Sequence, residues 1–178
     1  MPAVRVVLHL FYFKIVRKTM KKIASFTVNH IDLLPGVYVS RRDVCGNETL
    51  TTFDLRFTRP NLEPVMDTAG IHAFEHLGAT FLRNHPVWAE KTIYFGPMGC
   101  RTGFYVIFKG ELEPMEIAGV MDEMIRFVED FSGEIPGASA RDCGNYLDMN
   151  LSMAQYYARK FRREVLDCLG EQNTVYPE

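Results

Sequence analysis

The sequence has no run of about 18 apolar residues, which is the length that a membrane-spanning helix needs. It has no large excess of either charge: 20 Lys and Arg stand against 22 Asp and Glu, so no basic face is indicated. Internal repeats and low-complexity tracts are also lacking. These absences predict a soluble globular domain with neither a membrane nor a nucleic acid as its partner.

Cysteine is scarce and shows no tight spacing pattern. The four cysteines are Cys45, Cys100, Cys143 and Cys168. A chain of 178 residues can bury a sizeable core and does not need disulfides to stay folded. We therefore expect reduced thiols in a cytoplasmic protein. Some of them are candidates for chemistry, because a thiolate is a base, a nucleophile and a soft metal ligand.

The first nineteen residues differ from the rest. They are apolar and basic, and they end just before a second methionine, Met20. A signal peptide is one interpretation, but His9 and Lys14 interrupt the apolar stretch and no A-x-A-like cleavage site follows. We interpret residues 1–19 as an upstream start that is not the true one, or as a genuine extension. A single domain is expected over residues 20–178.

The remaining chain mixes pairs of strands with helices instead of alternating them strictly, which favours an α+β fold with a mainly antiparallel sheet packed against helices. Alternating and apolar segments predict strands at Gly36–Arg42, Leu50–Phe57, Lys91–Phe95 and Gly103–Phe108. Capping residues and helical periodicity predict helices from Asp67 or Thr68 to about Asn84, from Pro114 to about Phe131, and within Asn145–Leu169. The first two strands are expected to form a hairpin.

The sharpest motif is the H-x-x-E-H sequence at residues 72–76. His72 and His76 are four residues apart, so on a helix both can reach one metal ion. Glu75 lies on the same side and could transfer protons without being a ligand. The alternative is that both are ordinary helix histidines, with their hydrogen bonds satisfied and no metal bound.

Two further cysteines lie in glycine-containing loops. Cys100 follows Gly99 just before a predicted strand, where glycine permits unusual backbone angles and the close approach of a ligand. Cys143 precedes Gly144 between two helices and suits a third metal ligand. A His, His, Cys set leaves a fourth position open, as in catalytic sites. Taken alone, Cys100 is better explained as a small buried residue at a tight turn, and Cys143 alone is a weak signal.

Together, HAFEH, PMGCRTG and RDCGN occur in an order and at a chain length that resemble the LuxS family of S-ribosylhomocysteine lyases. Flanking segments are also similar to family segments: Ser25 and His30 near the start, and FDLRF around Arg56. The resemblance extends from about Met20 to the C-terminus. It implies an α/β sandwich with a small antiparallel sheet.

The resemblance also implies a role for each motif residue. It implies that His72, His76 and Cys143 bind a divalent metal, Fe(II) in the cell, although the ligand types alone also allow zinc or Co(II). Cys100 and Glu75 correspond to the acid–base groups. Ser25, His30 and Arg56 match positions that line the substrate pocket, which in the family lies at the interface of a homodimer.

The activity implied is the cleavage of S-ribosylhomocysteine to homocysteine and 4,5-dihydroxy-2,3-pentanedione, the precursor of autoinducer-2. The carbonyl group would migrate along the ribose, and β-elimination would then expel the thiol. The sequence departs from many family members at two positions, where Tyr94 replaces an acidic residue and Gly96 replaces a serine. Substrate contacts of that acidic residue are therefore not transferred to this chain.

Two other functions remain as alternatives. An H-x-x-E-H metallopeptidase would need a carboxylate as its third ligand, for which Glu129, Glu134 and Glu164 are candidates. A structural metal-binding module would need a fourth protein ligand, which Cys45 or Cys168 could supply.

Overall fold

A β-hairpin opens the fold. The computed structural model describes residues 22–23 and 26–178, so the expected extension at residues 1–19 and the predicted pocket residue Ser25 lie outside the described residues. Strand β1 (Gly36–Cys45) pairs antiparallel with β2 (Glu48–Arg56). The hairpin is confirmed, and both of its strands extend farther toward the turn than the predicted segments do. Cys45 still pairs with Glu48, because Gly46 adopts the left-handed φ of 63° that a two-residue turn requires.

The second pair of strands completes an antiparallel sheet. Strand β3 (Thr92–Pro97) follows the short 3-10 helix η2 (Ala89–Lys91), and β4 (Gly103–Lys109) lies between β2 and β3. The strand order is β1-β2-β4-β3, with every neighbouring pair antiparallel. This arrangement confirms the predicted sheet.

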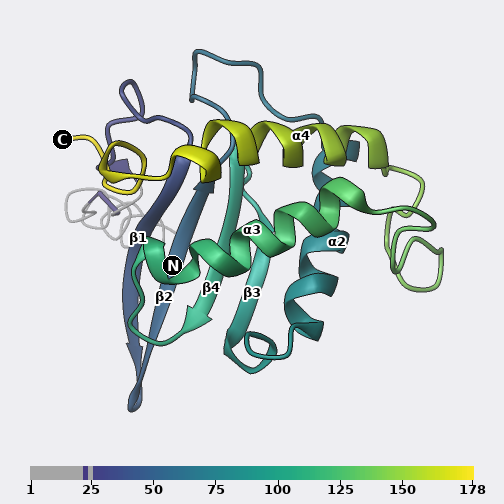
Figure 1. The fold of residues 1–178 in the computed structure, drawn as a ribbon, viewed down its shortest axis with the longest axis horizontal. Helices are drawn as coiled ribbons and strands as arrows, with labels where there is room; N and C mark the ends of the chain where they lie inside the picture. Colours follow the sequence, from purple (N-terminus) through teal and green to yellow (C-terminus); the bar gives the residue numbers. More distant parts are fainter. Residues whose placement is uncertain (1–21, 24–25) are drawn as a thin grey trace, which may run out of the picture.

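In the part of the chain that the structure describes, three α-helices pack on the apolar face of this sheet. They are α2 (Thr68–Asn84), α3 (Pro114–Asp130) and α4 (Leu151–Glu164). Figure 1 shows α3 and α4 crossing one face of the strands, with α2 beside β3. The hydrophobic core lies between these layers, where Phe53 and Leu55 of β2 meet residues from all three helices. The result is the predicted α+β fold.

Capping side chains decide where the helices begin. Asp67 caps α2 by accepting a hydrogen bond from the backbone N–H of Gly70 (2.8 Å). Asn150 caps α4 in the same way, by accepting from Met153 (3.0 Å). The helix predicted within Asn145–Leu169 therefore starts only at Leu151. After it come two further 3-10 helices, η3 (Leu166–Cys168) and η4 (Glu171–Asn173).

The sheet has a second, polar face. Because side chains alternate along a strand, Asp54 and Arg56 of β2 point away from the helices, opposite to Phe53 and Leu55. Both charged residues are nevertheless buried, at 1% and 3% exposure. Within the described residues, none of the helices is long and apolar enough to cross a membrane.

Candidate active site

Helix α2 holds the two histidines of the H-x-x-E-H motif side by side. Their ring centroids are 4.8 Å apart. His72 Nδ1 lies 2.9 Å from the carbonyl oxygen of Asp148, and His76 Nδ1 lies 2.7 Å from that of Pro136. A carbonyl can only accept, so each Nδ1 carries a proton, and in the neutral imidazole Nε2 is then the acceptor atom. This is the tautomer that a metal ligand needs.

Cys143 completes a group of three ligand atoms. It lies in the loop between α3 and α4, and its Sγ is 3.3 Å from His72 Nε2. The candidate ligand atoms of His72, His76 and Cys143 all lie within 4.8 Å of one another. Two imidazoles and a thiolate suit a divalent ion such as zinc or Fe(II). The residues present therefore fit the metal that the sequence predicts.

The loop that carries Cys143 is held by local hydrogen bonds and by one glycine. The backbone N–H of Cys143 donates to the carbonyl of Ser139 (3.0 Å). Gly137 has a φ of 72°, and a Cβ added to it would lie 3.3 Å from His76 Nδ1. A glycine thus allows the loop to approach the second histidine closely, a requirement that the motifs alone did not reveal.

Glu75 lines the same pocket as the three ligand residues. This open pocket has a volume of about 550 Å³ and lies between α2 and the loop before α4. Glu75 therefore lines the candidate metal pocket without belonging to the ligand group. Among the described residues, no aspartate or glutamate joins that group.

None of the three carboxylates proposed for a peptidase belongs to the ligand group, and two of them have other partners. Glu129 binds Arg162, and Glu164 binds Lys160. Cys168 donates to the carbonyl of Glu164 and lies outside the ligand group, as does Cys45. The geometry thus favours neither a third carboxylate nor a fourth protein ligand.

Cys100 lines a different pocket, on the polar face of the sheet. This pocket has a volume of about 250 Å³ and includes His30, Asp54, Arg56 and Tyr176. Cys100 follows the end of β3 in a tight turn, in which Arg101 has a φ of 59°. The two pockets share no lining residue, so one chain does not bring Cys100 next to Glu75.

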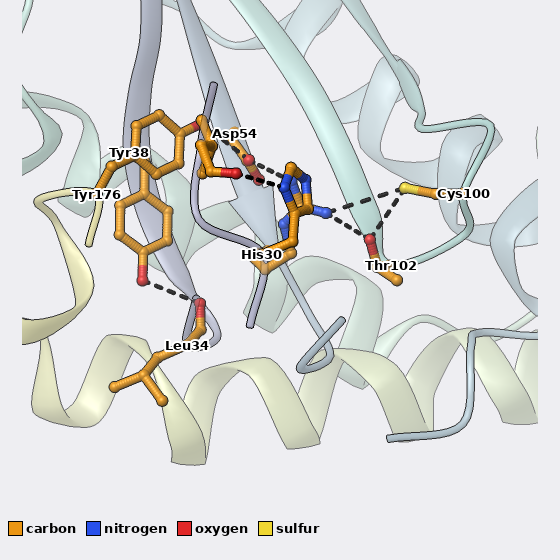
Figure 2. Close-up of polar contacts among 9 residues, drawn as sticks. His30, Leu34, Tyr38, Asp54, Cys100, Thr102 and Tyr176 are labelled. Carbon is orange, nitrogen blue, oxygen red and sulfur yellow. Dashed lines mark hydrogen bonds and ion pairs between the residues drawn. The ribbon is translucent and has the colours of Figure 1, made fainter. Parts of the chain in front are cut away.

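A buried ion pair forms the floor of the second pocket. Arg56 donates from Nη2 to Asp54 Oδ2 and from Nη1 to Thr102 Oγ1, each at 2.5 Å. The same Nη1 is 3.9 Å from Cys100 Sγ, and Thr102 Oγ1 is 3.1 Å from that sulfur. Figure 2 shows this network, with Asp54 on one side and Cys100 and Thr102 on the other. A permanent cation therefore faces the thiol.

Burial and charge act on this pair in opposite directions. Burial raises the pKa of the Asp54 carboxyl because it penalises the charged form, while the Arg56 guanidinium opposes that rise. Burial also disfavours the charge of Arg56, but the Asp54 carboxylate outweighs it and holds the pKa of Arg56 above its ordinary value. Asp54 Oδ1 and Arg56 Nε have no hydrogen-bond partner within the described part of the chain. Two buried polar atoms thus remain available to a polar ligand.

The two positions that depart from the family pattern lie together at the edge of the sheet. Tyr94 is half-exposed and lines a neighbouring cavity of about 310 Å³ with Tyr105 and Ile107. Its ring folds over Gly96, where an added Cβ would lie only 2.1 Å from Tyr94 Oη. The two departures are therefore coupled, because the ring occupies the space that a side chain at position 96 would need.

Sequence reasoning missed several residues of the polar pocket. Asp54 is one of them, although a carboxylate two residues from Arg56 on a strand lies on the same face as that cation and is a detectable signal. Thr102 and Tyr176 carried no signal. His30 lies in this pocket as predicted, with its Nδ1 2.9 Å from the carbonyl oxygen of Val28.

Sheet, helices and ligand group together define a class: an α+β protein with a candidate metal site of two histidines and one cysteine. Comparison with known proteins specifies it further. A model of the S-ribosylhomocysteinase (LuxS) family matches residues 23–172. The chain therefore belongs to the LuxS family, and the predicted resemblance is confirmed.

Individual relatives agree over nearly their whole length. The chain is 61% identical to the S-ribosylhomocysteine lyase of Clostridium beijerinckii over 158 residues, which is 89% of this chain and 99% of the relative. It is 62% identical to that of Clostridium acetobutylicum over 159 residues, covering 89% and 100%. The lyase of Finegoldia magna is 57% identical over 159 residues, with the same coverage.

Proposed function

We propose that this protein is an S-ribosylhomocysteine lyase that uses a divalent metal to release homocysteine and 4,5-dihydroxy-2,3-pentanedione. The observation that carries the proposal is the convergence of His72, His76 and Cys143 beside Glu75, in a chain whose relatives are named S-ribosylhomocysteine lyase. Residues 20–178 would form the catalytic domain. Four free thiols fit a cytoplasmic location.

His72, His76 and Cys143 would hold the metal, with Fe(II) expected in the cell and zinc or Co(II) able to replace it. A metal bound there acts as a Lewis acid on a sugar oxygen and makes the neighbouring C–H more acidic. The protein orients its ligands through the backbone carbonyls of Asp148 and Pro136, which fix both imidazole rings.

Cys100 and Glu75 would move the protons. In the open-chain sugar, a proton is removed from the carbon beside the carbonyl and one is returned to the former carbonyl carbon, while the hydroxyl proton passes from one oxygen to the other. Two such rounds move the carbonyl from C1 to C2 and then to C3. Removing the C4 proton then expels the homocysteine thiolate from C5 by β-elimination. Cys100 suits the role of base because the Arg56 guanidinium lies 3.9 Å from its sulfur, and a neighbouring cation generally makes a cysteine more reactive.

The two acid–base groups line different pockets of one chain, so acting on one sugar requires a second chain. We therefore propose a homodimer in which the Cys100 pocket of one protomer meets the metal pocket of its partner. Ser25, His30 and Arg56 would bind the substrate there. The buried but unpartnered Asp54 Oδ1 and Arg56 Nε support a polar ligand in the Cys100 pocket.

Release of free thiol tests the proposal. Metal-loaded protein is mixed with S-ribosylhomocysteine and followed with a thiol reagent, with the protein's own thiols subtracted. Cys100→Ala should lose roughly 10²–10⁴-fold in rate and keep its metal. His76→Ala should lose the metal itself, and Cys45→Ala, at the exposed end of β1, serves as the matched cysteine control. The proposal fails if folded, metal-loaded wild type releases no thiol.

A further inference from the structure

The C-terminal tail folds back onto the polar face of the sheet. It is anchored at η4, where Asn173 is buried and its side chain accepts a hydrogen bond from the backbone N–H of Gly170 (2.8 Å). The carbonyl oxygen of Asn173 lies against Gly36 at the start of β1, where an added Cβ would be 2.3 Å away. The last residue, Glu178, accepts through its carbonyl from the Asn29 side chain (3.0 Å). Both ends of the tail are thus attached near the Cys100 pocket.

Tyr176 is the residue of this tail that lines the Cys100 pocket. Its ring stacks on Tyr38 at a centroid distance of 4.8 Å and an interplanar angle of 9°. Its hydroxyl donates to Asp54 Oδ2 at 2.9 Å, the oxygen that also accepts from Arg56. Figure 2 shows the two stacked rings beside Asp54 and His30, on the side of the network away from Cys100. The family match ends at residue 172, so Tyr176 lies beyond it.

We propose that Tyr176 is a positioning residue that acts through Asp54 to hold Arg56 against Cys100. The inference rests on the proposed function in so far as Cys100 is the proton-transfer group. Its geometry is a continuous chain of contacts from the Tyr176 hydroxyl to Asp54, to Arg56, and on to the sulfur. The tail is therefore part of the active-site architecture and more than a surface extension.

The physical reason is the balance of hydrogen bonds on one buried carboxylate. Tyr176 and Arg56 are the two donors to Asp54 among the described residues. Without the tyrosine hydroxyl, the carboxylate depends on the guanidinium alone and draws it away from the sulfur. The hydroxyl remains a donor at neutral pH, because burial, and then the negative charge of Asp54, raise the pKa of the Tyr176 phenol.

The test compares Tyr176→Phe with Tyr38→Phe. Both variants keep the ring stack, but the Tyr38 hydroxyl donates to the carbonyl of Leu34 and does not touch Asp54. The readout is the rate of Cys100 alkylation by iodoacetamide at neutral pH without substrate, followed by peptide mass spectrometry. We expect Tyr176→Phe to slow alkylation about fivefold, because the guanidinium would lie farther from the sulfur that reacts. Tyr38→Phe should react at the wild-type rate.

A double-mutant cycle tests whether the effect passes through the carboxylate. Tyr176→Phe should slow alkylation no further in an Asp54→Asn background, because the intermediate group has been removed. Circular dichroism checks that each variant is folded. If Asp54→Asn does not fold, a chain ending at Val175 replaces it and should show the same slowing as Tyr176→Phe. Wild-type alkylation in Tyr176→Phe, or multiplicative effects in the double variant, would overturn the inference.

Catalysis distinguishes this inference from the proposed function. In thiol release, Tyr176→Phe should lower kcat more than it raises KM, whereas a tyrosine that merely bound substrate would change KM alone. If wild type releases no thiol while the alkylation pattern holds, the proposed function fails and the positioning role stands. If wild type releases thiol and Tyr176→Phe matches it in both assays, the positioning role fails alone.

Discussion

The start of α2, the helix that carries His72 and His76, depends on one tyrosine hydroxyl from α4, and removing that hydroxyl gives a quantitative prediction. Tyr157 donates to Asp67 Oδ2 (2.9 Å) and accepts from the backbone N–H of Asp67 (2.8 Å). Asp67 in turn caps α2 through its other oxygen. Gly70 lets the ring come this close, because a Cβ there would lie 2.8 Å from Tyr157 Cε2.

Tyr157→Phe removes both hydrogen bonds and keeps the ring. The bond to a carboxylate contributes roughly 1.5–3 kcal/mol, and a half-buried N–H left without a partner adds to the loss. We expect a decrease of about 2–3 kcal/mol in the free energy of unfolding. For a chain of this size, that corresponds to a melting temperature roughly 5–10 °C lower.

Thermal unfolding followed by circular dichroism measures this difference. All proteins are compared at one concentration and one metal loading, because association and ligands both raise the apparent stability. Tyr156→Phe is the matched control, since its neighbouring ring is half-exposed. Equal melting temperatures for the two variants, within about 1 °C of each other, would refute the assigned role of the Tyr157 hydroxyl.

Three further changes have defined outcomes. Gly137→Ala should weaken metal binding roughly tenfold in a chelator competition, because it strains a positive φ and crowds the second metal-ligand histidine; unchanged affinity would contradict this. Gly96→Ser should raise KM for thiol release by displacing the Tyr94 ring, and Tyr94→Ala in the same chain should relieve it; equal KM values would refute the coupling. Hydrogen bonding from Arg162 lowers the pKa of Glu129, so the ionised carboxylate stabilises the folded state. The stability lost in Glu129→Gln should therefore be constant above about pH 5 and vanish as the pH falls through that lowered pKa. Urea unfolding at several pH values measures this difference.

The local elements followed from the sequence because their signals are local. Asp67 predicted the start of α2, and alternation along β2 assigned Phe53 and Asp54 to opposite faces of the strand. The last helix could be placed only within Asn145–Leu169, because the helix-favouring composition continues outside α4. The start of α4 is set by the Asn150 cap. The residues before that cap belong to the loop that carries Cys143, and the Asp148 carbonyl of this loop accepts a hydrogen bond from His72.

What the sequence determined by itself was the family and the candidate ligand residues, because the types of the motif residues and their order are properties of the chain alone. The helical spacing of His72 and His76 already brings two ligands to one side. Only the tertiary structure decided that Cys143 joins them while Cys100 lies in a separate pocket. It alone placed Tyr176 on Asp54, 122 residues away in sequence, because such a contact depends on how the tail packs across the sheet and on no pattern near either residue.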